Sequence, residues 1–250
     1  MKFNYDLRRE SPSYDFVVFL ALCEQSRLLM QKESFYVYIN TDIHQHYKDT
    51  VYDWKWRITH LLMPLAMMMP NCRGVGIGSD GKWLGHYILN LKKDIYFDEN
   101  FGHITAGKRA LDSVKSYDHV ITLRERSLEP ARNSGDGWDI FRKYDKTLII
   151  PDTETMFTLQ NVNIELRMAT YQKAGMNWGV SNGCLALCVL NPLIPYRVLK
   201  IETPSVVSTN IRYIMRSSGI RRGGSPKIAT KDQKYIWKED TVENILEELR

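Results

Sequence analysis

The sequence predicts an α/β fold with parallel sheets, and three observations lead to this prediction. Short segments rich in β-branched and aromatic residues alternate with segments whose apolar residues recur at helical spacing. The alternation is most regular after residue 116, which is typical of the strand–helix–strand units that build a parallel sheet. A chain of 250 residues with 44% hydrophobic and 25% charged residues also has the composition of a globular protein with a full core.

In the first part of the chain, helical spacing predicts a helix over residues 14–30, which starts after Ser11-Pro12-Ser13. A second helix is predicted over residues 53–69 and ends before Pro70. Aromatic and β-branched residues predict strands over 34–40 and 72–78. The polar stretch from 92 to 108 is predicted to be a loop.

In the second part, strands and helices alternate. Strands are predicted over residues 119–123, 146–150 and 196–201, and helices over 138–144, 164–173, 183–190 and 241–249. Thr241 is the expected N-cap of the last helix. The sequence thus predicts an N-terminal α/β half (1–115), a C-terminal α/β half (116–225) and a tail with a helix (226–250).

Composition narrows the location and the partners. The chain has a net charge of +5 and a pI near 8.9, which suits a polyanion, an anionic membrane surface or a phosphorylated small molecule without choosing among them. The polar, charged start of the sequence does not predict a signal peptide, and no apolar run approaches the ~20 residues that a bilayer span requires. The four cysteines lack CxxC spacing. We expect a cytoplasmic protein with reduced thiols, and a peripheral membrane contact stays open.

The first candidate ligand site is the arginine-rich loop from residue 124 to residue 134, which follows a predicted strand. Ligands of open parallel sheets bind beyond the carboxyl ends of the strands, and arginines there offer forked donors to phosphate oxygens. Its candidate binding residues are Arg124, Arg126, Arg132, Asn133 and Ser134. In the alternative, the loop is solvated and its arginines pair with the acidic residues Glu125, Glu129 and Asp136.

The second candidate is a glycine-containing turn before the predicted helix over 183–190. Backbone N–H groups at the start of a helix suit an anion, although an ordinary N-cap explains the same residues. Its candidate binding residues are Asn177, Gly179, Ser181, Asn182 and Gly183.

The third candidate is Asp152, at the end of a predicted strand, which either binds a ribose hydroxyl, acts as a base or caps the next helix. His44 and His46 have no companion ligands, so we predict neither a metal site nor a cofactor. The basic residues from Arg212 to Arg222 read as a solvated face more readily than as a nucleic-acid site, so nucleic acid is not an expected partner.

Taken together, these motifs resemble those of a known group of enzymes. The runs Ile121-Thr122-Leu123-Arg124-Glu125, Pro130-Ala131-Arg132-Asn133-Ser134 and Ile150-Pro151-Asp152-Thr153-Glu154 resemble bacterial proteins encoded with surface-polysaccharide genes. Together with the later turn at Asn182-Gly183 and the strand containing Pro195-Tyr196, they are similar to the C-terminal half of GT-B glycosyltransferases. The resemblance covers mainly residues 118–250.

The resemblance implies two Rossmann-like halves that face each other and a nucleotide-sugar donor held by the C-terminal half. It implies a metal-independent glycosyltransferase, with an unknown acceptor, in which Arg124, Arg126 and Arg132 neutralise the leaving diphosphate. The general base would come from the first half, where Asp15 and His86 are unranked candidates. The turn has Asn182-Gly183-Cys184 where many relatives have Gly-Pro. A non-catalytic nucleotide- or glycan-binding protein of the same fold is therefore the alternative.

Overall fold

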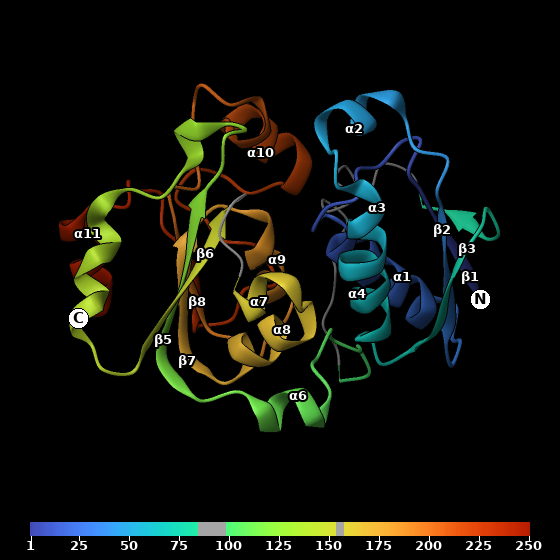
Figure 1. Cartoon of the computed structure of the whole chain (residues 1–250), viewed down its shortest axis with the longest axis horizontal. Coiled ribbons are helices and arrows are strands. Elements are labelled where there is room, and N and C mark those ends of the chain that lie inside the picture. Colours follow the sequence, from blue (N-terminus) through green and yellow to red (C-terminus); the bar gives the residue numbers. More distant parts are fainter. Residues whose placement is uncertain (85–98, 154–157) are drawn as a thin grey trace.

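The computed structural model describes residues 1–84, 99–153 and 158–250 of the chain. It is an α/β structure with two sheets whose paired strands all run parallel. One sheet, called sheet A, is formed by the N-terminal part of the chain, and the other, sheet B, by the C-terminal part (Figure 1). The predicted fold class, an α/β protein with parallel sheets, is confirmed at this level.

Within the described residues, sheet A has four strands in the order β3-β2-β1-β4. They are β1 (Lys2–Asp6), β2 (Phe35–Asn40), β3 (Cys72–Ile77) and β4 (Lys82–Trp83). The described helices of this part are α1 (Phe16–Leu29), α2 (Gln45–Thr50), α3 (Trp54–Arg57), the π-helical turn η1 (Ile58–Leu62) and α4 (Met63–Met67).

Sheet B has five strands in the order β6-β5-β7-β8-β9. They are β5 (Tyr117–Glu125), β6 (Thr147–Thr153), β7 (Ala174–Val180), β8 (Tyr196–Leu199) and β9 (Gln233–Tyr235). The α-helices are α6 (Lys108–Ser113), α7 (Leu159–Val162), α8 (Ile164–Gln172), α9 (Ala186–Val189), α10 (Ile211–Ser218) and α11 (Val242–Leu249). The 3-10 helices are η2 (Pro130–Arg132), η3 (Asp136–Lys143), η4 (Gly183–Leu185) and η5 (Val207–Thr209).

One sequence prediction is wrong at an important place. The segment that was predicted to turn from Asn177 onward is a strand of sheet B until Val180, so the turn begins only at Ser181. β7 was not predicted as a strand because it contains two glycines and an asparagine, which are residue types that are generally unfavourable in strands. At Gly179 the glycine is required, since a Cβ atom would lie 2.7 Å from the carbonyl oxygen of Thr122 on the neighbouring strand.

The two sheets are joined by helices that share one hydrophobic core. Residues of α1, such as Leu20 and Cys23, belong to the same buried cluster as Leu187 and Cys188 of α9. In Figure 1, α1 and α4 lie on the side of sheet A that faces sheet B, and α7, α8 and α9 lie on the facing side of sheet B. Buried apolar contacts between these helices therefore hold the two sheets together.

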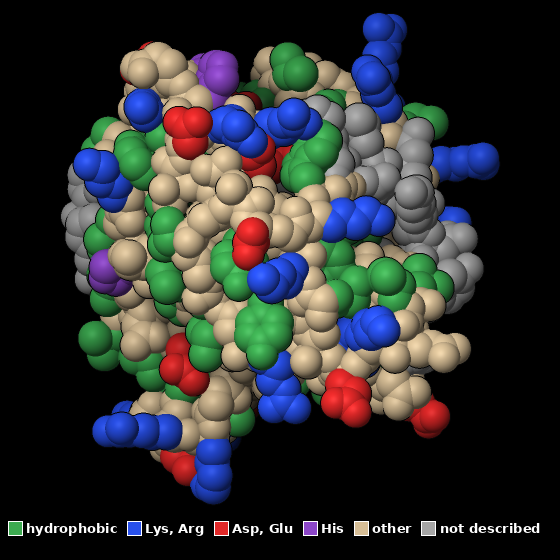
Figure 2. Space-filling model, turned by 90° about the vertical axis from the view of Figure 1, so that its right-hand side faces the viewer, with side chains coloured by type: hydrophobic (Ala, Val, Ile, Leu, Met, Phe, Trp, Pro, Cys, Tyr) green, Lys and Arg blue, Asp and Glu red, His purple; other side chains and the backbone are tan. Residues whose placement is uncertain are grey.

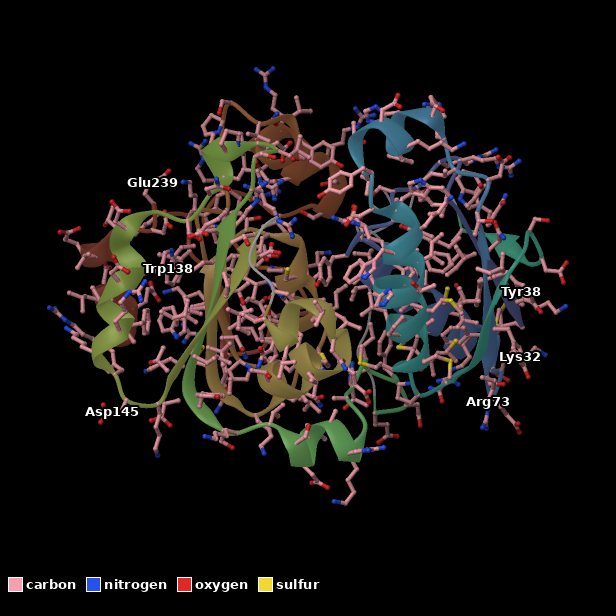
Figure 3. All side chains as sticks on the ribbon, viewed as in Figure 1. Lys32, Tyr38, Arg73, Trp138, Asp145 and Glu239 are labelled. Carbon is pink, nitrogen blue, oxygen red and sulfur yellow. The ribbon has the colours of Figure 1, made fainter. Side chains whose placement is uncertain are left out.

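A second, smaller core covers the other side of sheet B. Trp138 of η3 lies there, remote from sheet A, whereas Lys32, Tyr38 and Arg73 lie at the opposite end of the molecule (Figure 3). The Trp138 indole donates a 2.7 Å hydrogen bond to the buried carboxylate of Asp240, which also accepts from a backbone N–H at 2.6 Å. These bonds fix η3 and the chain tail on this side of the sheet.

The outer face of the N-terminal part carries mixed charges. Figure 2 shows Lys and Arg side chains spread among acidic and apolar ones over the described residues of this face, without a single basic patch. Among the described residues, no helix has both the length and the apolar character that a bilayer span requires. All four cysteines are free and buried.

A candidate binding cleft between the two sheets

A cleft of about 1420 Å³ lies between the two parts of the chain. Its lining includes segments that follow the carboxyl ends of parallel strands, such as Ser13–Asp15 after β1 and Ser181–Cys184 after β7. In Figure 1, α2 and α10 stand on either side of the end of the molecule where these segments meet. Both sheets thus turn their ligand-binding edge toward one space.

The strand order of sheet B locates the crevice more closely. The chain passes from β5 to β6 on one side and places β7 on the other side of β5, so the order reverses between β5 and β7. Parallel sheets bind ligands at such a reversal, because the two connections leave in opposite directions. Arg132, in the loop after β5, donates a 3.0 Å hydrogen bond to the carbonyl oxygen of Ser181, after β7. This bond spans the crevice.

The described lining of the cleft is more basic than acidic. Six cationic side chains line it, and they are Arg57, Arg124, Arg126, Arg132, Arg167 and Lys227. Four acidic side chains line it as well, and they are Asp15, Asp53, Glu129 and Asp152. A space with this excess of positive charge favours an anionic ligand.

Arg124, near the end of β5, holds the loop that follows the strand. Its guanidinium donates to the carbonyl oxygens of Leu128 at 2.6 Å and Glu129 at 3.1 Å, and to the side-chain oxygen of Asn133. Ser134 accepts from the Arg124 N–H at 2.9 Å. Neither Asn133 nor Ser134 is among the cleft-lining residues. Burial, with a smaller contribution from Arg132, lowers the pKa of Arg124. These three residues hold the shape of the loop.

Arg126 and Asp152 form an ion pair across neighbouring strand ends. The guanidinium Nη2 lies 2.6 Å from the Asp152 carboxylate, and the Arg126 side chain is 27% exposed in the cleft. The parallel register of β5 and β6 pairs Arg124 with Asp152 and so brings these segments together. Asp152 is occupied by this pair in the structure.

Arg132 joins three segments of the crevice. Its Nη1 lies 2.6 Å from the carboxylate of Glu129, which accepts a further hydrogen bond from Ser208 at 3.2 Å. Glu129 has a positive φ of 55°, which is uncommon for a residue other than glycine. The Nε of Arg132 is buried and has no acceptor among the described residues.

The turn after β7 contributes fewer residues than the sequence predicts. Ser181, Asn182 and Gly183 line the cleft, whereas Asn177 and Gly179 lie within the strand and do not. The Asn177 amide is buried and donates to backbone carbonyl oxygens at 3.0 and 3.1 Å. Asn182 caps η4 by accepting from the Leu185 N–H, and its buried amide nitrogen has no acceptor among the described residues.

The helix dipole at this turn is weak. The helical segment that follows consists of η4 and α9, which have three and four residues, whereas a full macrodipole needs several aligned turns. Side chains therefore supply most of the positive potential in the crevice.

The floor of the cleft contains a buried arginine that the sequence did not single out. Arg167 of α8 is 1% exposed and donates to Asn161 at 2.7 Å and to the carbonyl oxygen of Gln160 at 2.8 Å. Its guanidinium lies within 4 Å of no carboxylate in the described residues. Arg167 could have been identified from the sequence, because it is a charged residue on the apolar side of a predicted helix, four residues before Tyr171. A negative charge placed near this buried guanidinium would stabilise it.

Tyr14 and Cys184 close the floor where the two parts of the chain meet. A Cβ atom on Gly183 would lie 3.2 Å from the Cβ of Tyr14, so the two segments approach closely. Burial raises the pKa of Cys184 to about 12, although Arg167 and a hydrogen bond with Tyr14 oppose the shift. The thiol is therefore protonated at neutral pH.

The predicted bases have different positions. Asp15 lines the cleft at the start of α1, and its carboxylate adds to the rise in the pKa of Tyr213, which burial mainly causes. Tyr213 of α10 lines the same cleft. His86 lies outside the described residues.

The wall formed by the N-terminal part carries aromatic residues that the sequence analysis also missed. Tyr47, Tyr52, Trp56 and His60 line the cleft, and Tyr52 is 85% exposed. The ring centroids of Trp56 and His60 lie 4.5 Å apart, and the angle between the ring planes is 4°.

Comparison of the chain with protein-family models, curated protein sequences and solved structures finds no match.

Proposed function

We propose that the protein is a glycosyltransferase that binds a nucleotide sugar in the cleft and transfers the sugar to an acceptor without a metal ion. The observation that carries the proposal is the convergence of two parallel sheets, carboxyl edges first, on one cleft with an excess of basic side chains. In this reading, the two parts of the chain correspond to the facing Rossmann-like halves of the GT-B arrangement.

The crevice between β5 and β7 is the proposed diphosphate site. Arg126 and Arg132 present partly exposed guanidinium groups there, and Arg167 adds a buried positive charge beneath them. Donors fixed in advance around a leaving diphosphate stabilise its developing charge at little reorganisation cost. The unsatisfied N–H groups of Arg132 and Asn182 favour a ligand that brings acceptor oxygens.

Isothermal titration calorimetry tests this function directly. The wild-type protein is titrated with a panel of nucleoside diphosphates, the corresponding nucleotide sugars and inorganic pyrophosphate. We expect at least one nucleoside diphosphate to bind and to be displaced by its nucleotide sugar. If the folded protein binds none of them, the proposed function is wrong.

The alternative is a nucleotide- or glycan-binding protein of the same fold without turnover. Its support is the pairing of Arg126 with Asp152 and of Arg132 with Glu129, which leaves both arginines engaged within the protein. Nucleotide binding that is followed by neither transfer nor hydrolysis of any nucleotide sugar would favour this alternative.

A further inference from the structure

His60 lies in an irregular helical turn that lines the cleft. The helix through residues 54–67 changes from α3 to the π-helical turn η1 and back to α4. Such π turns are rare and often occur at functional sites. Here the carbonyl oxygen of Trp56 accepts from two side chains, the Thr59 hydroxyl at 3.1 Å and the His60 Nδ1 at 3.0 Å.

These hydrogen bonds select one tautomer of His60. A carbonyl oxygen can only accept, so the Nδ1 that contacts it must carry the hydrogen. The Thr59 hydroxyl lies 2.8 Å from the same Nδ1, and because it donates to the carbonyl, it turns a lone pair toward that N–H. In the neutral ring, Nε2 is therefore the unprotonated nitrogen.

The position of the His60 ring allows Nε2 to act on a ligand in the cleft. Parallel stacking on Trp56 fixes the plane of the imidazole, and His60 is exposed and lines the cleft. Within residues 1–84, 99–153 and 158–250, no hydrogen bond to His60 Nε2 is present. An indole face also attracts a cation, so the stacking supports the ring after it has taken up a proton.

We propose that His60 Nε2 is the general base of the reaction, an inference that rests on the proposed function. The Nε2 lone pair takes the proton of the acceptor hydroxyl while the acceptor oxygen forms a bond to the anomeric carbon of the sugar. The bond between that carbon and the diphosphate oxygen breaks, and its electron pair leaves with the diphosphate. The imidazolium then returns its proton to water.

The experiment compares His60→Gln with two matched variants. Glutamine keeps a polar side chain but cannot take the proton. His46→Gln is the control, because His46 is an exposed histidine of α2 that does not line the cleft. Asp15→Asn tests the competing carboxylate. For each protein, calorimetry measures binding of the tightest nucleoside diphosphate, and a steady-state assay measures hydrolysis of its nucleotide sugar with water as acceptor.

We expect His60→Gln to bind the diphosphate within about 2-fold of wild type and to lose roughly 10²- to 10⁴-fold in kcat, the usual contribution of a general base. Nitrogen-15 NMR of the histidines, assigned with the same variant, should show His60 with hydrogen on Nδ1. Loss of turnover in Asp15→Asn alone, wild-type turnover in His60→Gln, or hydrogen on Nε2 overturns the role of His60.

Two further outcomes separate the two proposals. If the wild-type protein binds nucleoside diphosphates but hydrolyses no nucleotide sugar, the base is wrong while the cleft still binds its ligand. If the wild-type protein binds no nucleoside diphosphate at all, the proposed function fails, and the role of His60 falls with it.

Discussion

The ion pair between Arg126 and Asp152 allows a quantitative test of the proposed diphosphate site. The two side chains meet at 2.6 Å, so each partially neutralises the other. Arg126→Ala removes a charged donor from the cleft and also uncovers the Asp152 carboxylate. Asp152→Asn has the opposite effect, because it releases the guanidinium for a ligand.

The magnitudes follow from these two consequences. Loss of one charge-assisted hydrogen bond weakens binding by about 1.5–3 kcal/mol. An uncovered carboxylate about 4 Å from a phosphate oxygen adds repulsion of about 1–4 kcal/mol, depending on the effective dielectric constant. We therefore expect Arg126→Ala to raise the diphosphate Kd by at least about 50-fold. In Arg126→Ala/Asp152→Asn the repulsion is absent, and the increase should fall to about 10- to 150-fold.

Calorimetric titration of the four proteins in this double-mutant cycle measures both the loss of the hydrogen bond and the repulsion from Asp152. Arg142→Ala is the matched control, since Arg142 forms an exposed ion pair with Asp139 of η3, outside the cleft. Its Kd should equal that of the wild type. The reasoning is refuted if Asp152→Asn weakens binding, since Asp152 would then contact the ligand directly, as a ribose-binding carboxylate does. Equal Kd values for Arg126→Ala and the double variant would likewise refute the repulsion.

Ligand binding, folding stability and its pH dependence each provide one further test. Arg132→Ala should weaken diphosphate binding by about 1.5–3 kcal/mol by calorimetry, and an unchanged Kd would assign this arginine to the loop alone. Gly179→Ala should lower the free energy of unfolding, measured by urea titration, by about 1–3 kcal/mol, because the new methyl group would lie 2.7 Å from the Thr122 carbonyl oxygen. A variant as stable as the wild type would contradict the packing of β5 against β7. Burial lowers the pKa of His119, whose Nδ1 accepts from Trp178 at 3.2 Å, so the unfolded chain binds the proton more readily and stability should fall as the pH drops below about 6.5. Urea titrations at about pH 7.5 and about pH 5.5 should show a smaller difference for His119→Asn than for wild type; equal differences would exclude His119 as a source.

Local pattern was sufficient for much of the fold. The apolar spacing of α1, the aromatic and β-branched run of β2 and the cap of α11 depend on near neighbours, and each prediction is confirmed to within a few residues. The strand β1 has only five residues with charged ends, and β7 contains glycines that a neighbouring strand requires. Both segments form strands because neighbouring strands pair with them, and a local sequence pattern does not contain this information.

The sequence by itself determined that basic and polar residues follow the β5 strand, and hence that this loop lies at the carboxyl edge of a sheet. Only the tertiary structure decided which way each side chain points. The Arg124 guanidinium lines the cleft but is held by loop carbonyl oxygens that accept its hydrogen bonds, whereas the guanidinium groups of Arg126 and Arg132 pair with carboxylates. It also brought His60 to the same space, across the shared core of the two parts. Hydrogen bonds and packing between distant segments make these choices, and their partners are far apart in the sequence.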